Sequence, residues 1–149
     1  MKDDEKTQFR AFREMAGMTQ LDFAKAMGVT VESVKKWENP KYSQVPPKDA
    51  WDILQEAIDR QSEIVDFALK KFESLKDEFE GKPGVMLPYW RTQEDFEKAH
   101  PGEGGSYTMS NANARLIAFE LKKRGYHITF GWGGLKETLD NSPIADCTY

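Results

Sequence analysis

The sequence has very little cysteine and histidine: one Cys (Cys147) and two His (His100 and His127) among 149 residues. A single cysteine cannot form a disulfide within the chain, which favours a reducing compartment, and we expect the cytoplasm. These few residues give no zinc-ligand set at a workable spacing, so neither a metal site nor a cofactor is predicted. No nucleophile–base pair is visible either, and we predict that the protein is not an enzyme.

Long apolar runs are also missing from the sequence. No stretch approaches the roughly 20 apolar residues of a membrane-spanning helix, so no membrane partner is expected. The first residues, MKDDEKTQ, are charged and lack the apolar core of a secretory signal. Charged residues make up 31% of the chain, and four Trp and nine Phe are available to build a core. This composition is typical of a globular protein with one domain or two small ones.

The net charge of −4 excludes a surface that is basic all over, but the charge is unevenly distributed. Residues 6–45 contain seven Lys or Arg against four Asp or Glu, whereas residues 46–80 contain five against ten. Residues 81–149 contain eight of each sign. Nucleic-acid binding needs only one basic face, so the positive excess directs attention to residues 6–45.

Residues 20–38, QLDFAKAMGVTVESVKKWE, show the pattern of two short helices joined by a tight turn. Gly28 can make the turn because it lacks a Cβ, and the hydroxyls of Thr19 and Thr30 can cap the first and the second of these helices. Each half carries apolar residues at helical spacing, namely Phe23, Ala24 and Met27 in the first and Val34 and Trp37 in the second. The stretch therefore predicts a helix-turn-helix whose second helix offers a polar face to a partner.

Two further helices are expected around this motif. A first helix over residues 6–16 carries an apolar stripe of Phe9, Phe12 and Met15. A long helix is expected over residues 48–80, because neither Pro nor Gly interrupts that stretch. Its seam residues alternate spacings of three and four: Trp51, Leu54, Ile58, Gln61, Val65, Ala68, Phe72, Leu75 and Phe79. This pattern fits either a coiled-coil seam or a helix whose two halves pack on different domains.

The GKPG stretch at residues 81–84 is the best candidate for a domain boundary. It predicts a DNA-binding domain with the long helix over residues 1–80 and an α+β domain over residues 81–149. In the second domain we expect strands over 85–90 and 126–132, and helices over 92–100 and 110–124. Thr92 and Ser110 are the expected caps of these helices, and the inward face of the second is Ala114, Ile117, Ala118 and Leu121. Two strands alone are marginal in water, which favours a second subunit.

Residues 9–39 resemble the lambda-repressor-like (Cro/C1-type, XRE) helix-turn-helix family. The matching residues are Gln20, Phe23, Ala24, Met27, Gly28, Val29, Val34, Trp37, Glu38 and Asn39. The resemblance implies a five-helix-type DNA-binding domain and places Arg13 where the family has an arginine paired with the glutamate matched by Glu38. The residue types agree with a structural ion pair between Arg13 and Glu38 that does not touch DNA.

The rest of the chain resembles the YdiL-like regulators, a group that includes anti-CRISPR-associated autorepressors. The stretches that carry this resemblance are Pro46-Pro47, AWDIL at 50–54, LPYWRTQEDFEKAHP at 87–101 and ANARLIAFELKKRGY at 112–126. It implies a homodimer joined mainly through the C-terminal domain, acting on an inverted-repeat operator, with RNA left open as a second nucleic acid. The expected fold is mainly α with a small β component: a helix-turn-helix domain, a long connecting helix and a C-terminal α+β dimerisation domain.

A recognition helix reads bases with side chains near its N-terminus and one turn later. In the expected recognition helix, Val31–Glu38, these positions are Val31, Glu32, Ser33 and Lys36. Lys36 can donate to guanine, Glu32 can accept from cytosine, Val31 can contact a thymine methyl, and Ser33 suits a base or a phosphate. The expected phosphate contacts are Gln20, Lys35, Lys41, Tyr42, Ser43 and Gln44.

These observations predict a sequence-specific DNA-binding transcriptional regulator, an autorepressor that binds double-stranded DNA with a palindromic operator as a homodimer. Two alternatives stay open. One is an antitoxin-type regulator whose C-terminal region binds a partner protein. The other is a ligand-responsive regulator with a pocket among Trp90, Tyr107, Phe119 and Trp132.

Overall fold

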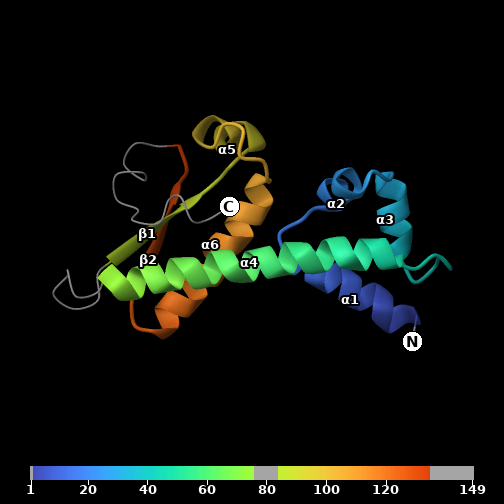
Figure 1. Ribbon diagram of the computed structural model, residues 1–149, viewed down its shortest axis with the longest axis horizontal. Helices are drawn as coiled ribbons and strands as arrows, with labels where there is room; N and C mark the ends of the chain where they lie inside the picture. Colours follow the sequence, from blue (N-terminus) through green and yellow to red (C-terminus); the bar gives the residue numbers. More distant parts are fainter. Residues whose placement is uncertain (1, 76–83, 135–149) are drawn as a thin grey trace. The chain divides into compact units, whose positions relative to one another are not determined.

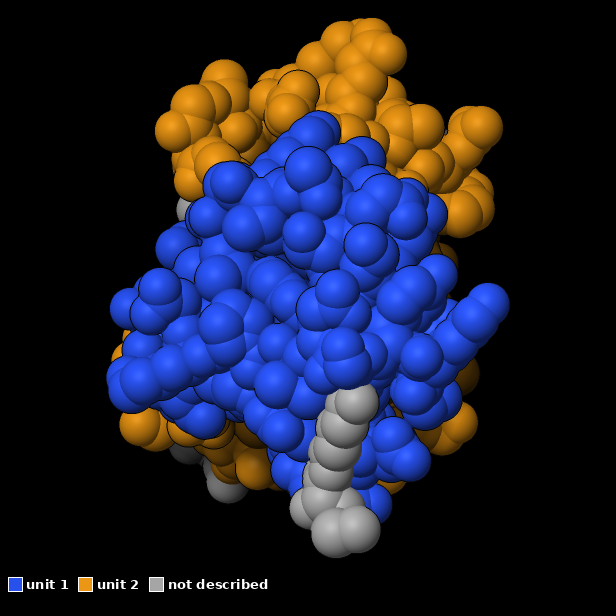
Figure 2. Space-filling model, turned by 90° about the vertical axis from the view of Figure 1, so that its right-hand side faces the viewer, with its two compact units in different colours: residues 1–61 blue, residues 62–149 orange. Residues whose placement is uncertain are grey.

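The computed structural model describes residues 2–75 and 84–134, which fall into two compact units, residues 1–61 and 62–149 (Figure 2). The described part contains six helices and one two-stranded sheet, so the expected mainly α composition with a small β component is confirmed. Unit 1 contains three short helices and the first part of a long one: α1 (Lys2–Met15), α2 (Gln20–Met27), α3 (Val31–Glu38) and α4 (Lys48–Leu75). Unit 2 contains the rest of α4 and, in chain order, β1 (Gly84–Tyr89), α5 (Gln93–Ala99), α6 (Tyr107–Lys123) and β2 (His127–Trp132) (Figure 1).

The predicted domain boundary between residues 80 and 81 lies outside the described residues and stays a prediction, as does the tail with Cys147. By contacts, the chain divides between Gln61 and Ser62, inside α4. The reason is that the two parts of α4 bury their apolar residues in different cores.

The two short helices α2 and α3 begin at the expected caps. The Thr19 hydroxyl accepts from the Asp22 amide, and the Asp22 carboxylate accepts from the Thr19 amide, which completes a capping box. The Thr30 hydroxyl caps α3 by accepting from the Ser33 amide. Between the helices Gly28 adopts φ 74°, a left-handed conformation that favours glycine. The predicted turn chemistry is confirmed at these positions.

Aromatic rings form the centre of unit 1. The Phe9 ring lies 5.1 Å from Phe23, 6.2 Å from Trp37 and 5.2 Å from Trp51, each in an edge-to-face arrangement. The interpretation of α1 was wrong in one respect, because Phe12 is 39% and Met15 51% exposed. The buried face of α1 instead follows the 3–4–3 spacing of Lys6, Phe9, Arg13 and Ala16. Phe12 lines a pocket of about 190 Å³ with Trp51, Leu54, Gln55 and Ile58.

The long helix α4 contributes to both units, which confirms the interpretation in which its halves pack on different domains. Ala50 and Leu54 are buried in unit 1. Gln61, the polar member of the predicted seam, donates its side-chain amide to the Met15 carbonyl (2.8 Å) at the end of α1. Residues from the second half of α4 join the core of unit 2: Val65, Ala68, Leu69 and Phe72.

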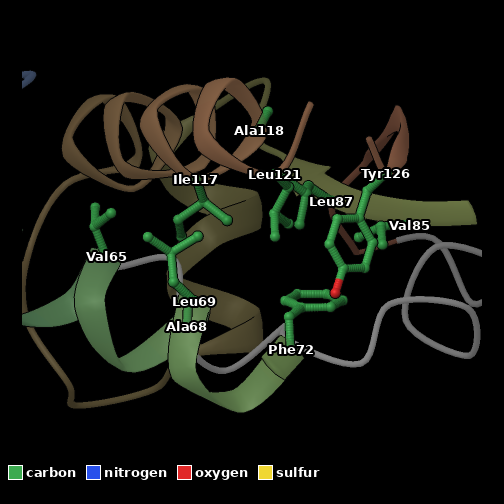
Figure 3. Close-up of a cluster of buried hydrophobic side chains, with 10 residues drawn as sticks. All are labelled: Val65, Ala68, Leu69, Phe72, Val85, Leu87, Ile117, Ala118, Leu121 and Tyr126. Carbon is green, nitrogen blue, oxygen red and sulfur yellow. The ribbon is translucent and has the colours of Figure 1, made fainter. Parts of the chain in front are cut away.

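The core of unit 2 brings residues of α4, β1 and α6 together with Tyr126 (Figure 3). The predicted inward face of α6 is confirmed, since Ala114, Ile117, Ala118 and Leu121 are all buried. The predicted cap Ser110 was wrong. The helix begins earlier, because the Ser106 hydroxyl accepts from the Met109 amide (3.2 Å), and Ser110 lies fully buried inside the helix.

The two strands of unit 2 are parallel, with Gly84 opposite His127 and Tyr89 opposite Trp132. Parallel strands need a crossover connection, which α5 and α6 supply. Just after β1, the Asn111 side chain accepts from the Trp90 amide (2.8 Å) and donates to the Trp90 carbonyl (2.9 Å). Trp90 is 2% exposed and its ring packs edge-on against Phe96 and His100.

Gly133, just after β2, lies directly against the Trp90 ring. A Cβ at Gly133 would stand 2.5–2.7 Å from three ring atoms, so Gly133→Ala should lower the free energy of unfolding by about 1–3 kcal/mol through overpacking. The matched control is Gly84→Ala, whose Cβ would meet only His127 Cδ2 at 4.0 Å. Urea denaturation of both variants checks this, and equal midpoints for the two would contradict the close packing.

Candidate nucleic-acid interface

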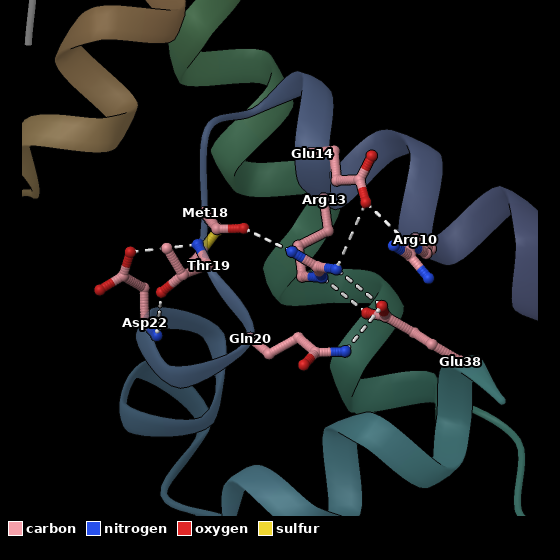
Figure 4. A network of polar contacts seen from close by, with 8 residues as sticks. All are labelled: Arg10, Arg13, Glu14, Met18, Thr19, Gln20, Asp22 and Glu38. Carbon is pink, nitrogen blue, oxygen red and sulfur yellow. Dashed lines mark hydrogen bonds and ion pairs between the residues drawn. The ribbon is translucent and has the colours of Figure 1, made fainter.

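A buried ion pair joins α1 to the end of α3 (Figure 4). Arg13 Nε lies 2.6 Å from Glu38 Oε2, and Arg13 Nη2 lies 2.7 Å from Glu38 Oε1. The third nitrogen of the guanidinium, Nη1, donates to the Met18 carbonyl at 2.8 Å. The two side chains are only 6% and 2% exposed, so this is the two-pronged arginine–carboxylate geometry in a site shielded from water. The pair holds α3 in place and leaves neither partner on the surface.

Gln20 at the start of α2 belongs to the same network (Figure 4). Its side-chain amide donates to Glu38 Oε1 at 3.2 Å, and the residue is half-buried. The side chain predicted to contact a phosphate is thus directed at Glu38 in the free chain. Its contact with DNA stays a prediction.

The polar residues of α3 lie on the side opposite its anchors. Val34, Trp37 and Glu38 are buried, whereas Glu32 and Lys35 are exposed and form an ion pair at 3.4 Å. This pair is worth little in water, since both side chains are more than half exposed. The remaining predicted base contacts, Val31, Ser33 and Lys36, are half-buried. The four predicted base-contacting residues all belong to this one short helix.

The segment after α3 is tightly turned. The Asn39 side chain accepts from the Lys41 amide (2.9 Å), and the Asn39 carbonyl accepts from the Tyr42 amide (3.1 Å). Lys36 Nζ lies 5.7 Å from the centroid of the Tyr42 ring and makes a cation–π contact with it. The predicted phosphate-contacting residues of this segment, Lys41, Tyr42, Ser43 and Gln44, are all exposed. Two of the predicted DNA-contacting side chains, Lys36 and Tyr42, therefore touch each other.

Sequence reasoning missed Lys6. This lysine is 1% exposed, and its ammonium donates to the backbone carbonyls of Lys36, Asn39 and Gln44 at 2.7, 3.0 and 2.5 Å. Lysines are rarely buried, so composition gave no reason to single it out. The available signal was its position, seven residues before Arg13 on the buried face of α1.

The exposed face of α1 carries a second arginine pair, which differs from the buried one. Arg10 Nε donates to Glu14 Oε1 at 2.7 Å, with both side chains more than half exposed. The hydrogen bond from Arg10 lowers the pKa of Glu14 from its ordinary value. Glu14 Oε1 also lies 3.9 Å from Arg13 Nη2. Replacing Arg10 removes an exposed positive charge from α1 and leaves both partners of the buried pair in place, so it offers a control for that pair.

Unit 2 contains the residues that sequence analysis considered for a ligand pocket, but their environments differ. Trp90 is 2% exposed, whereas Phe119 is 64% and Trp132 50% exposed. Tyr107 is half-buried at the start of α6, where its backbone amide donates to the side-chain oxygen of Gln93 (2.9 Å). Within residues 2–75 and 84–134 there is no group of three or more His, Cys, Asp or Glu side chains that could hold a metal ion. No helix in those ranges is long and apolar enough to cross a membrane.

Comparison with known proteins bears on unit 1. Residues 9–56 match a family model described as Helix-turn-helix, which covers α1 from Phe9, all of α2 and α3, and the start of α4. No curated protein matches the chain. The members of the matched family are regulators, in keeping with the predicted non-enzymatic class. Residues 9–56 of this chain form an XRE (Cro/C1-type) helix-turn-helix domain, the kind of domain with which transcriptional regulators bind DNA.

Proposed function

We propose that this protein is a cytoplasmic, sequence-specific repressor that binds an inverted-repeat operator as a homodimer and regulates its own synthesis. The observation that carries the proposal is the construction of α3. Three residues of α3 are buried and one of them is ion-paired to α1, while polar residues on its other side are exposed. A helix fixed in this way can enter the major groove without changing shape. The proposal includes the similarity of this chain to the YdiL-like regulators, the group that contains the anti-CRISPR-associated autorepressors.

In this proposal Val31, Glu32, Ser33 and Lys36 contact bases, and residues around them contact phosphates. The phosphate set is Gln20, Lys35, Lys41, Tyr42, Ser43 and Gln44. Phosphate contacts fix the register of the protein on the duplex, and base contacts supply the sequence preference. The exposed segment after α3 supports this division, because its residues follow the recognition helix directly.

The homodimer is proposed to form through unit 2, within residues 81–149. What supports it is a group of exposed aromatic side chains on the sheet: Phe130 and Trp132 are 46% and 50% exposed, and both rings lie against the Tyr89 ring, 5.4 and 6.3 Å between centroids. Neighbouring exposed apolar side chains mark interaction surfaces, whereas apolar side chains scattered singly do not. If this chain is instead an antitoxin-type regulator, its partner protein would bind the same side chains. Sedimentation of the purified chain and of its co-expressed complexes distinguishes a homodimer from a complex with a partner protein.

Selection of bound fragments from random duplex DNA tests the proposal as a whole. Recovery of a palindrome, with half-sites about one helical turn or roughly 10–10.5 bp apart, is the expected result. Recovery of a single half-site would argue against the dimer but would still support α3 as the recognition helix. If no duplex were selected, the DNA-binding proposal would fail, and the same selection with RNA would decide whether RNA is the nucleic acid bound.

The two lysines of α3 should behave differently on replacement. Lys36→Ala should cost about 1–3 kcal/mol of binding to the selected operator and relax the preference at one base pair. Lys35→Ala, the matched control on the same helix, should weaken operator and random DNA alike, because a phosphate contact carries no sequence information. Titration of both duplexes at one salt concentration measures this. An equal loss on operator and random DNA for Lys36→Ala would remove Lys36 from the base-reading set.

A further inference from the structure

Lys6 lies on α1, far in sequence from any residue expected to touch DNA, yet its ammonium lies at the C-terminal end of the recognition helix α3. The ammonium donates to three backbone carbonyls from one stretch of chain, those of Lys36, Asn39 and Gln44. Lys36 lies in the last turn of α3, Asn39 is the residue that caps it, and Gln44 ends the turn that follows. An ammonium has three protons, so it can donate to all three of these carbonyls.

The position of this ammonium has an electrostatic reason. The last carbonyls of a helix lack partners within the helix and carry the negative end of its dipole. A cation at that end is favourable, and the carbonyls replace the water that a buried ammonium loses. Because the acceptors are backbone atoms, Lys6 fixes the course of the chain itself and not merely one side-chain rotamer.

The stretch held by Lys6 contains most of the residues proposed to meet DNA phosphates. Between the acceptors at Asn39 and Gln44 lie Lys41, Tyr42 and Ser43, all exposed. The same stretch is held from the other side by Lys36, whose Nζ lies over the Tyr42 ring. The amides of Lys41 and Tyr42 donate to Asn39 oxygens and complete the turn. The hydrogen bonds from Lys6 to Asn39 and Gln44 join this stretch to α1.

We propose that Lys6 is a positioning residue for DNA binding, which fixes residues 39–44 against the end of α3 without touching DNA itself. This inference rests on the proposed function, because it assigns the held stretch to phosphate contact. A stretch that is already ordered in the free protein loses little conformational entropy on binding. Without Lys6 the stretch would have to be ordered by the DNA, and fewer phosphate contacts would form.

The experiment compares Lys6→Met, which keeps the length and apolar stem of the side chain, with Lys6→Arg, which keeps charge and donors. Arg10→Met is the matched control, since it removes one positive charge from the exposed face of the same helix. In the free proteins, amide hydrogen exchange at Lys41 and Tyr42 should rise at least about tenfold in Lys6→Met and stay unchanged in Arg10→Met. Because this measurement needs no DNA, it tests Lys6 even if no operator is found.

On the selected operator, Lys6→Met should lower affinity at least about tenfold and reduce the slope of log affinity against log salt by about one. Lys6→Arg should restore both toward the wild-type values. Should Lys6→Met fail to fold, Lys6→Gln replaces it, because glutamine keeps two donor protons. Its affinity for the operator should be lower than that of Lys6→Arg but still measurable. Unchanged exchange at residues 39–44, or lower stability with an unchanged salt slope, would overturn the proposal and leave Lys6 a purely structural residue. Failure of the wild type to select any duplex, with the exchange result as expected, would refute the proposed function alone.

Discussion

Replacing Arg13 by methionine should lower the free energy of unfolding by about 3–5 kcal/mol, since it leaves the Glu38 carboxylate buried without its cation. The Glu38 side chain is 2% exposed, so water cannot take over the two hydrogen bonds from Arg13. The change also removes the donor to the Met18 carbonyl between α1 and α2. Within the part of the chain that the structure describes, the side-chain amide of Gln20 would be the donor left facing the carboxylate. Urea denaturation followed by circular dichroism measures the loss.

Two further variants make this first prediction specific. Arg10→Met breaks the exposed pair with Glu14 and should cost less than about 1 kcal/mol, because exposed ion pairs contribute little. The double variant Arg13→Met/Glu38→Leu removes both charges together and should recover much of the stability lost by Arg13→Met. A double variant no more stable than Arg13→Met would mean that the lost hydrogen bond to Met18, and not the orphaned carboxylate, dominates.

Phe72→Ala should cost about 3–5 kcal/mol, because it opens a cavity in the core of unit 2. The Phe72 side chain is 2% exposed and its ring lies edge-on to Tyr126, 5.9 Å between centroids (Figure 3). Both rings belong to the cluster that joins α4 to β1 and α6. Thermal and urea unfolding provide the measurement.

The control for Phe72→Ala lies on the same helix. Phe67 is 60% exposed, so Phe67→Ala makes the same chemical change with almost no loss of burial and should stay within about 0.5 kcal/mol of wild type. Similar losses in both variants would indicate that helix propensity or an interface involving α4, and not the core, decides the effect.

The parts of the fold that followed from sequence depend on neighbours along the chain. Thr19, Gly28 and Thr30 act through bonds to residues a few positions away, so their roles were readable from spacing. The inward face of α6 was readable for the same reason. The cap of that helix was misplaced because Ser106 and Ser110 are both good capping residues, and the choice depends on the preceding loop.

What sequence could not supply are the contacts between distant segments. The parallel pairing of β1 and β2 follows from how α5 and α6 return the chain, and periodicity does not encode it. Lys6 was overlooked because its acceptors are carbonyls, which look the same in every residue. Among the proposed DNA contacts, sequence located the helix, but it did not reveal that Gln20 is directed at Glu38 or that Lys36 rests on Tyr42.

The parallel pairing of β1 and β2 also sets an order in time. Unit 1 is built from helices that are neighbours along the chain, and it leaves the ribosome first. The sheet of unit 2 cannot close until β2, near the end of the described chain, has been made and has found β1 across two intervening helices. Such long-range pairing is slow compared with local helix packing. If the protein acts as the proposed dimer, a newly made chain would complete its helix-turn-helix domain before it could pair with a second copy. Repression would therefore begin later than synthesis.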